Sequence, residues 1–251
     1  MIEMIEVKDL KKSFNGQEVL RGVNLTIHKG ETTTIIGRSG GGKSVLLKHL
    51  IGVIRPDSGS IVVDGEDITK MNNRELKQVK RKFGMVFQFA ALFDSMTVFD
   101  NIAFQMRELS ALKEDDIIAQ TIEMLKRIGM EGMGDKYPDE ISGGMAKRVG
   151  LARALVMRPE YMFFDEPTTG LDPVVENTIH QLMMTCTADA TCTDIVVSHN
   201  IGEVMKISDK VVMLHEGEII ESGTPDEIAE SDNSVVRQFL TGSPDGPIQI
   251  Y

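Results

Sequence analysis

The chain has 251 residues, of which 41% are hydrophobic and 26% are charged, a composition typical of a soluble globular protein. The formal net charge of −11 excludes binding to nucleic acid or to anionic lipid by overall charge alone. No apolar run approaches the roughly 18 residues that would span a bilayer, and the amino terminus lacks the apolar core of a signal peptide. We therefore expect a cytoplasmic protein that binds no nucleic acid and reaches any membrane through an embedded partner.

The first half of the chain alternates between strand-like and helix-like segments. TTTIIG (32–37) and SIVVDG (60–65) are β-branched runs that end at glycine, and they predict strands. The apolar spacing of GGKSVLLKHLIGV (41–53) predicts a helix. From Phe89 to about Met157 the pattern changes, and short helices replace strands.

Strands return after this helical stretch. YMFFDEP (161–167) and TDIVVSHN (193–200) read as buried strands that end in polar residues. DKVVMLHEGEIIESG (209–223) predicts a hairpin that turns at Glu216 and Gly217. Strand and helix thus alternate on both sides of a helical insertion, which predicts an α/β core with a parallel sheet and a helical subdomain.

The segment GRSGGGKS, Gly37 to Ser44, matches the phosphate-loop pattern G-x-x-x-x-G-K-[ST]. It follows a predicted strand and opens a predicted helix, the context that the pattern requires. Glycines let backbone N–H groups wrap phosphates, Lys43 can reach the β- and γ-phosphates, and the Ser44 hydroxyl can bind Mg²⁺. The alternative, a glycine-rich turn with a chance lysine, does not explain this order of strand, loop and helix.

An acidic pair ends the strand YMFFDEP. Asp165 can hold the shell of Mg²⁺, and Glu166 can polarise the attacking water. Because side chains alternate along a strand, we expect Glu166 to point to the face opposite Asp165. The alternative is a solvated turn, which the phosphate loop upstream makes the weaker interpretation.

Two further residues are ambiguous in isolation. His199 ends the strand-like DIVVSH, where a lone histidine is more often a strand cap than a catalyst. Gln88 follows GMVF and can bind Mg²⁺ or water through its amide. A second helix start, at Ser142, Gly143 and Gly144, also offers free backbone N–H groups to an anion.

These motifs resemble those of the nucleotide-binding subunits of ABC transporters, in the order that family has them, over about residues 5–225. GRSGGGKS is similar to the Walker A loop, Gln88 to the Q-loop glutamine and ISGGM to the signature motif. YMFFDE is similar to Walker B with its catalytic glutamate, TGLDP to the D-loop and His199 to the H-loop histidine. Phe14 stands where the family has an aromatic ring that stacks on adenine.

The resemblance implies a P-loop NTPase (RecA-like) α/β core with an antiparallel β subdomain and a helical ABC-specific subdomain. It places the ATP-binding core at 1–88 and 159–225, the helical signature subdomain at 89–158, and a C-terminal helix with an extended tail at 226–251. The implied cofactors are ATP and Mg²⁺. The implied catalytic residues are Glu166, His199, Lys43 and Gln88, and the implied Mg²⁺ ligands are Ser44, Gln88 and Asp165. The implied nucleotide-binding residues are Phe14, Gly37, Arg38, Ser39, Gly40, Gly41, Gly42, Lys43, Ser44, Val45, Ser142, Gly143, Gly144 and Asp172.

The family also implies why one chain has two phosphate-binding helix starts. Its ATPases act as head-to-tail dimers, so Ser142, Gly143 and Gly144 would bind the γ-phosphate held by the Walker A loop of the other subunit. The signature departs from the family's L-S-G-G-Q, since Ile141 replaces leucine and Met145 replaces glutamine. We expect ATP binding to survive this change and the rate to be tuned by it.

A few positions resemble one branch of the family, the ATPases of Mce-type lipid transporters such as the Mla system. These positions are Val45, Met145, the segment FQFAALFDSMTVFDNIAF (87–104) and the segment VRQFLTGSPDGPI (236–248). The branch implies a homodimer on the cytoplasmic face of the inner membrane, a permease pair, Mce-domain lipid-binding subunits and, in some members, a STAS-domain subunit. The implied activity is phospholipid transport that maintains outer-membrane lipid asymmetry.

Alternatives remain open. The same ATPase could serve a small-solute importer, or act without a transporter as a nucleotide-gated switch. The apolar residues after Gln88 could be subdomain core or could line a groove for a permease helix. The tail, residues 242–251, could be a frayed terminus or could pack on a neighbouring chain through Ile248, Ile250 and Tyr251.

Overall fold

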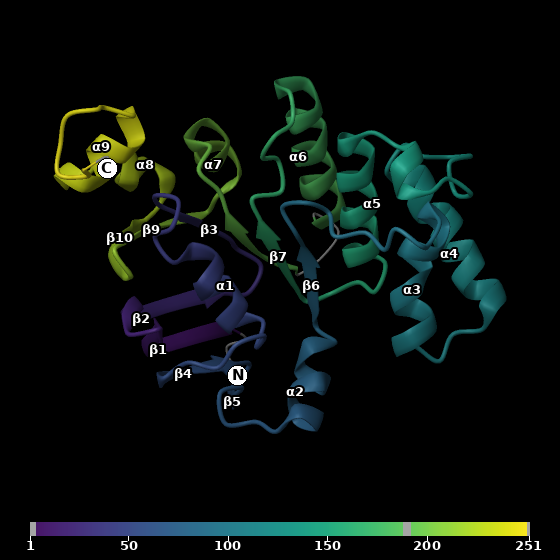
Figure 1. The fold of residues 1–251 in the computed structure, drawn as a ribbon, viewed down its shortest axis with the longest axis horizontal. Coiled ribbons are helices and arrows are strands. Elements are labelled where there is room, and N and C mark those ends of the chain that lie inside the picture. Colours follow the sequence, from purple (N-terminus) through teal and green to yellow (C-terminus); the bar gives the residue numbers. More distant parts are fainter. Residues whose placement is uncertain (1–3, 188–191, 250–251) are drawn as a thin grey trace. The chain divides into compact units, whose positions relative to one another are not determined.

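The structure is a computed structural model that describes residues 4–187 and 192–249. The chain forms two compact units (Figure 1). Unit 1 combines the residues up to Lys80 with those from Thr193 onward, and unit 2 spans residues 81–192. Each unit is described by itself below.

Unit 1 contains a four-stranded antiparallel sheet in the order β2-β1-β4-β5. Alternate residues of β1, such as Ile5 and Val7, are buried, while Lys8 and Asp9 beside them are exposed. This period of two marks a sheet with one face on the core and one in water. The strands are β1 (Met4–Phe14), β2 (Gln17–His28), β4 (Ser58–Val63) and β5 (Glu66–Asp67).

Unit 1 also contains the parallel strands β3 (Thr32–Ile36), β8 (Thr193–Val197) and β9 (Lys210–His215). β3 lies between the other two and pairs parallel with both. β10 (Glu218–Gly223) pairs antiparallel with β9. The predicted hairpin is confirmed, because Glu216 and Gly217 join these strands with φ of 47° and 82°, as a two-residue turn of the primed type requires.

The helices of unit 1 bury apolar stripes against these strands. Val204, Ile228 and Val236 of three different helices form one core cluster with Ile36 and Met213 of the parallel strands. This cluster fixes the carboxyl-terminal part of the chain to the sheet. The helices are α1 (Lys43–Leu50), α2 (Asn73–Lys80), α7 (Ile201–Ile207), α8 (Pro225–Ala229) and α9 (Ser234–Thr241).

The segment that follows α9 folds back on that helix. The side chain of Gln238 donates hydrogen bonds to the carbonyls of Ser243 and Ile248, at 3.2 and 3.1 Å, and accepts one from the amide of Ile248 at 2.6 Å. The guanidinium of Arg38 also donates to the carbonyl of Gln249 at 2.6 Å. The described tail is therefore ordered by its own chain. Ile250 and Tyr251 lie outside the described residues, so their predicted packing on a neighbouring chain stays a prediction.

Unit 2 combines two parallel strands, β6 (Phe83–Val86) and β7 (Tyr161–Asp165), with a group of helices. Within this unit α3, α4 and α5 lie together (Figure 1). The predicted change from strands to helices after Phe89 is confirmed. The helices are α3 (Val98–Leu109), α4 (Glu114–Arg127), the 3-10 helix η1 (Pro138–Glu140), α5 (Gly143–Leu155) and α6 (Pro173–Thr187).

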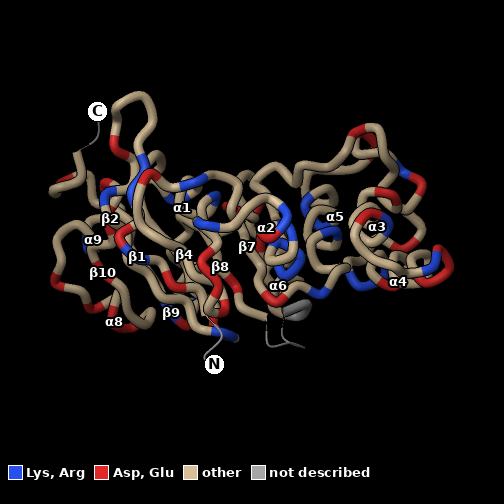
Figure 2. The backbone as a smooth tube through the Cα atoms, turned by 90° about the horizontal axis from the view of Figure 1, so that it is seen from below, with Lys and Arg blue, Asp and Glu red and all other residues tan. Residues whose placement is uncertain are grey.

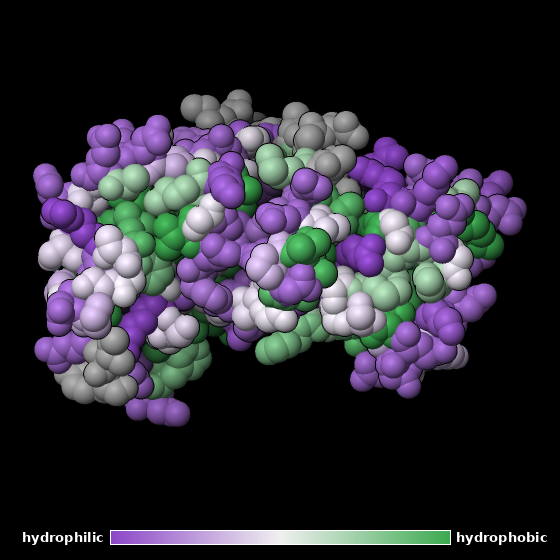
Figure 3. All heavy atoms as spheres, turned by 90° about the horizontal axis from the view of Figure 1, so that it is seen from above, coloured by the Kyte–Doolittle hydropathy of each residue, from purple (hydrophilic) through white to green (hydrophobic). Residues whose placement is uncertain are grey.

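The surfaces of both units are of mixed charge and polarity. Basic and acidic residues are interspersed along the backbone of each unit (Figure 2). On the face drawn in Figure 3, hydrophobic residues emerge as separate small patches among hydrophilic ones. In the part of the chain that the structure describes, no helix combines the length and the apolar character needed to cross a membrane.

Candidate active site

The phosphate loop of unit 1 connects β3 to α1, and its backbone requires glycine at two positions. Gly37 has a φ of 146°, and a Cβ there would collide with the carbonyl of Leu214. Gly42 has a φ of 98°, and a Cβ there would lie 3.0 Å from the carbonyl oxygen of Val19. Any side chain would therefore strain the loop and push it against β2 and β9.

The side chains of the loop divide into an inward lysine and exposed residues. Lys43 is only 4% exposed, and its ammonium donates to the carbonyls of Gly37 and Arg38 at 2.7 and 3.0 Å. Arg38 and Ser39 are exposed, whereas Ser44 and Val45 in the first turn of α1 are half-buried. A pocket of about 210 Å³ adjoins the loop. It is lined by Arg38, Ser39, Gly40, Gly41, Leu214, His215 and Glu216.

Strand pairing brings His199 to the same edge of the sheet as the phosphate loop. β3 and β8 are parallel neighbours, with Ile35 opposite Val197, and each of the two segments follows directly on its strand. His199 is exposed there. The adjacent Asn200 caps α7 by accepting a hydrogen bond from the amide of Glu203 at 3.3 Å. Asn200, and not His199, thus supplies the cap of α7.

Phe14 ends β1 at the tight turn into β2, and its ring is 43% exposed. The ammonium of Lys12 lies 5.4 Å from the centre of the ring. An exposed aromatic ring with a cation beside it can stack on a planar ligand.

The carboxyl ends of β6 and β7 bring Gln88 and the acidic pair of unit 2 together. The amide of Gln88 donates to Oε2 of Glu166 at 3.1 Å, and the hydroxyl of Thr169 donates to the same oxygen at 3.2 Å. Asp165 is the last residue of β7 and is half-buried. The structure therefore joins Gln88 to the candidate water-polarising glutamate, a pairing of residues far apart in the sequence.

The predicted reason for the orientation of Glu166 is wrong. Strand alternation does not apply to this residue, because β7 ends at Asp165 and Glu166 follows in the left-handed region with a φ of 48°. Such a backbone is costly for a residue with a side chain and is concentrated at functional sites. The turn, and not the pleat of the strand, directs the carboxylate.

Lys147 is a site residue that the sequence analysis missed. It is buried on α5, and its ammonium donates at 2.6 Å to the carbonyl of Thr169, the residue whose hydroxyl bonds Glu166. Burial lowers the pKa of the Lys147 ammonium, while the negative charges of Glu166 and Glu176 oppose that shift. No clear signal in the sequence marked it, because α5 also carries Arg148 and Arg153 and their types do not reveal which of these basic residues lies near Glu166.

Ser142 and the two glycines of the second helix start lie where α5 begins. Ser142 is the N-cap residue, and its hydroxyl accepts a hydrogen bond from the amide of Met145 at 3.3 Å. A Cβ on Gly144 would lie 2.7 Å from Cγ1 of Val175 on α6, so packing within the unit requires that glycine. Apart from its chain neighbours and the backbone of its own helix, a Cβ on Gly143 would have no heavy atom of the described chain within 4 Å. The described structure thus gives no reason for glycine at position 143.

Asp172 is exposed and caps α6. Its carboxylate accepts from the amides of Val174 and Val175 at 3.0 and 3.1 Å. Within the chain it therefore has a structural role, whatever it contacts in an assembly.

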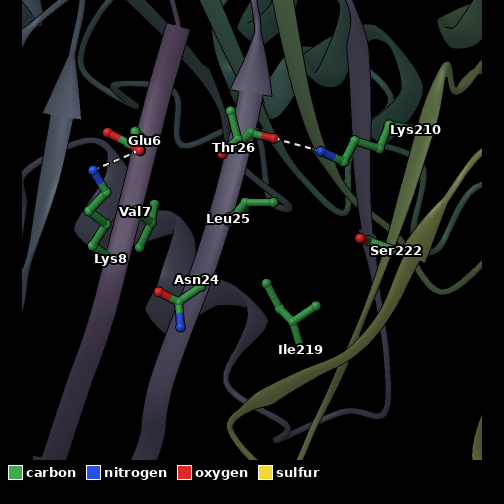
Figure 4. A pocket seen from close by; sticks show the side chains of 9 residues that line it. All are labelled: Glu6, Val7, Lys8, Asn24, Leu25, Thr26, Lys210, Ile219 and Ser222. Atoms are coloured by element: carbon green, nitrogen blue, oxygen red, sulfur yellow. Dashed lines mark hydrogen bonds and ion pairs between the residues drawn. The ribbon is translucent and has the colours of Figure 1, made fainter.

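A second pocket of unit 1, about 320 Å³ in volume, contains none of the predicted site residues (Figure 4). Its wall carries an ion pair between Lys8 and Glu6 at 2.8 Å and a hydrogen bond from Lys210 to the carbonyl of Thr26 at 2.7 Å. With its charged groups already paired, this hollow offers no obvious chemistry.

Comparisons with known proteins agree with this site. Residues 20–169 match the family described as "ABC transporter". The chain is 45% identical to the probable ribonucleotide transport ATP-binding protein mkl of Mycobacterium tuberculosis, over 97% of this chain and 68% of that protein. It is 39% identical to the intermembrane phospholipid transport system ATP-binding protein MlaF of Haemophilus influenzae, over 98% of this chain and 93% of that protein.

Solved structures resemble the fold as well. The dimeric, post-hydrolysis structure of the ATP-binding cassette MJ0796 bound to ADP and Pi has a TM-score of 0.81, with 28% identity over 88% of this chain and 99% of that one. The predicted fold class, an ABC-type P-loop NTPase, is confirmed. The chain therefore belongs to the ABC transporter family, as an ATP-binding subunit that hydrolyses ATP.

Proposed function

We propose that this protein is the ATPase of a phospholipid transporter of the Mla type, and that it acts as a homodimer whose two ATP sites are each completed by the signature residues of the other subunit. The observation that carries the shared site is Gly143. This exposed glycine at the start of α5 has no contact in the described chain that would exclude a side chain. Gly143 is the first residue of α5, where the backbone N–H groups are not bonded within the helix. We infer that the space beside it is used by a phosphate held by the other subunit.

The phosphate loop fits a nucleotide. Its glycines leave the backbone open where a Cβ would meet Leu214 or Val19, and α1 begins directly after them. The N-terminus of a helix offers unpaired N–H groups to an anion. We propose that Lys43 turns from the loop carbonyls to the β- and γ-phosphates, and that the ring of Phe14 stacks on adenine. The loop residues Gly37, Arg38, Ser39, Gly40, Gly41, Gly42, Ser44 and Val45 would line the phosphates.

The donor set also fits Mg²⁺, which prefers hard oxygen ligands. The Ser44 hydroxyl, the Asp165 carboxylate and the amide oxygen of Gln88 would hold the ion. The amide nitrogen of Gln88 already donates to Glu166, so its oxygen remains for a ligand. When bound, Mg²⁺ would neutralise charge that develops on the phosphates during hydrolysis.

Glu166 is the residue that we assign to polarising the attacking water, and His199 the residue that we assign to the γ-phosphate. The carboxylate of Glu166 accepts hydrogen bonds from both Gln88 and Thr169, which hold it in one orientation. A side chain fixed before the reaction needs no reordering in the transition state.

Glu166→Gln should keep ATP binding and lose at least about a hundredfold in turnover, the usual size of a general-base effect. ATP should then trap a dimer, to be detected by light scattering. Glu160→Gln, directly before the other end of β7, is the matched control and should turn over normally, since Glu160 pairs with Lys82 at the surface. Normal turnover by Glu166→Gln would remove this residue from the role.

Exposed aromatic residues on both sides of Gln88 support a permease contact. Phe89 is 86% exposed, and Phe87 and Phe93 are also exposed, whereas Val98 of the same segment is buried. We propose that the exposed members receive a short helix of each permease subunit, and that the buried ones are core. Gln88 would then link the state of the nucleotide to this contact. The protein would lie at the cytoplasmic face of the inner membrane, with Mce-domain and STAS-domain subunits as further partners.

The division into an ATP-binding core (1–88 and 159–225), a helical signature subdomain (89–158) and a C-terminal helix with its tail (226–251) is part of this proposal. The relatives support two kinds of cargo, since the name of MlaF refers to phospholipid and that of mkl to ribonucleotide. We favour phospholipid because Val45, Met145 and the segment 87–104 resemble the ATPases of Mce-type lipid transporters, and similar proteins from two organisms carry the name MlaF. A small-solute importer is the second candidate.

The deciding experiment is affinity purification from the native membrane in mild detergent, with proteins and lipids identified by mass spectrometry. A permease together with an Mce-domain protein and phospholipid supports the proposal. Recovery of a permease with a soluble binding protein and no lipid would contradict phospholipid as the cargo and favour a small solute. Recovery without any membrane protein would contradict transport altogether.

A further inference from the structure

Two consecutive alanines, the first of them two residues after Gln88, adopt a backbone that alanine disfavours. Ala90 and Ala91 have φ of 57° and 48°, both in the left-handed region. Such residues normally occur singly, and mostly as glycine, because the Cβ of an L-residue crowds the following carbonyl. A pair of them persists only where the surroundings hold it in place.

Arg153 of α5 holds this pair through both of its terminal nitrogens. Its Nη1 donates to the carbonyl of Ala91 and its Nη2 to the carbonyl of Ala90, each at 2.8 Å. The guanidinium also lies over the ring of Phe93, 5.6 Å from its centre. One turn earlier on α5, a Cβ on Gly150 would lie 3.2–3.3 Å from Ala90, so the helix and the turn are in close contact.

The cost of burying the charge of Arg153 indicates that its hydrogen bonds to Ala90 and Ala91 do more than fill space. The residue is 7% exposed, and among the described residues no carboxylate forms an ion pair with it. Burial lowers the pKa of its guanidinium, which nevertheless stays charged. An unpaired buried cation is expensive, and an apolar side chain of similar volume would pack at lower cost. What an apolar residue cannot supply is a planar fork that bonds two successive carbonyls.

We propose that Arg153 is a positioning residue for ATP hydrolysis, which ties the segment carrying Gln88 to the helix that begins with the signature residues. α5 carries Ser142 at its start and Arg153 about 16 Å further along its axis. Gln88, two residues before the strained pair, bonds Glu166. A displacement of α5 would therefore be transmitted to Gln88, and from there to the catalytic carboxylate. This inference rests on the proposed roles of Gln88 and Glu166.

The test compares Arg153→Lys with Arg148→Lys in the full-length protein. Arg148 lies on the same helix and bonds the carbonyls of Ile128 and Gly129 at 3.0 and 3.4 Å, away from Gln88. Lysine keeps the charge and loses the fork. We expect Arg153→Lys to lower kcat about tenfold with KM for ATP changed less than about twofold, because the phosphate loop is untouched. Arg148→Lys should leave both near the values of the unchanged protein.

A double-mutant cycle with Ala90→Gly and Ala91→Gly decides the mechanism. Glycine adopts positive φ without strain. In that background the hydrogen bonds from Arg153 are therefore less needed to hold the turn in its left-handed conformation. We expect the loss caused by Arg153→Lys to shrink from about tenfold to about threefold there. An undiminished loss would mean that Arg153 acts through packing alone, and would overturn the inference, as would equal effects of the Arg153 and Arg148 variants.

Hydrogen exchange separates this inference from the proposed function. Arg153→Lys should speed exchange of the amides of Ala90 and Ala91, and unchanged exchange there would overturn the inference even if turnover falls. Gln88→Ala tests the function independently. If its turnover is normal, the role of Gln88 is wrong, and so is the proposed path from α5 to catalysis.

Discussion

Two adjacent residues at the start of α5, Gly143 and Gly144, are glycine for different reasons. Gly144 faces the side chain of Val175 on α6, which leaves no room for a Cβ. Gly143 is exposed, and the described chain leaves a Cβ there free of contacts. Packing within the chain therefore explains Gly144, whereas we attribute Gly143 to contact with a partner subunit.

Alanine substitutions should separate these reasons. Gly144→Ala should lower the free energy of unfolding by about 1–2 kcal/mol, because the stiff β-branched side chain of Val175 must move. Gly143→Ala should leave it unchanged or raise it by up to about 1 kcal/mol, and yet reduce ATP-driven dimerisation. Urea denaturation and light scattering measure the two effects. If both variants lost stability equally and dimerised normally, the distinction would be wrong.

His49 is a buried titratable residue in the helix that follows the phosphate loop. Its Nδ1 lies 2.7 Å from the carbonyl of Val45, so that nitrogen carries the proton of the neutral ring. Its Nε2 is buried with no hydrogen-bond partner among the described residues. Burial, as the largest cause, lowers the pKa of His49 below 6.5.

The stability of the chain should therefore fall as the pH drops below about 6.5. In that range His49 is protonated in the unfolded chain but not in the folded chain. The free energy of unfolding is therefore highest above this pH and falls as the pH approaches the lower pKa of the folded state. The loss can reach about 1.4 kcal/mol per pH unit for one histidine. His49→Leu should flatten the dependence in urea denaturation between pH 7 and 5.5. Identical slopes in the two proteins would contradict this account.

At the scale of elements, the sequence predicted the strands and the turn whose signals lie within a few consecutive residues. β3, β7 and β8 are short apolar runs that end in polar residues or glycine, and the turn at Glu216 and Gly217 has its own local signature. The resemblance to Mla-type ATPases is also confirmed by relatives. The contacts of Arg153 with Ala90 and Ala91 were beyond prediction, because they join residues distant in sequence whose types do not reveal the pairing. The left-handed turn at Glu166 was missed for the related reason that a strand pattern does not show where the strand ends.

The side chain of the buried Gln238 makes three of the hydrogen bonds that hold the tail after α9. Gln238→Ala removes three hydrogen bonds to Ser243 and Ile248, and we expect the amide of Ile248 to lose its protection in hydrogen exchange. Thr241→Val is the matched control, since the Thr241 hydroxyl bonds only carbonyls of α9. Retained protection in Gln238→Ala would show that the tail is held by other contacts.

At the scale of the whole molecule, a shared site predicts that two inactive chains rescue each other. Lys43→Ala removes the phosphate-binding ammonium, and Gly143→Asp places a negative charge where the partner's phosphate would bind. A mixed dimer has one site with neither change. Random mixing should therefore restore about a quarter of the normal turnover if the sites act independently, since about half of the dimers are mixed.

Each variant alone, at the same total concentration, is the control for this mixture and should stay inactive. No rescue after verified subunit exchange would mean that each site is built within one chain, which would contradict the proposed dimer.

The bond from Arg38 to the carbonyl of Gln249 has a practical consequence. A bulky group placed directly after Gln249 would start beside a carbonyl that is held by the phosphate loop. A bulky purification tag or fluorescent protein attached there would crowd the entrance for the nucleotide and depress turnover for reasons unrelated to the cargo. Proteins made for measuring activity or for isolating partners should therefore carry their tag away from residue 249.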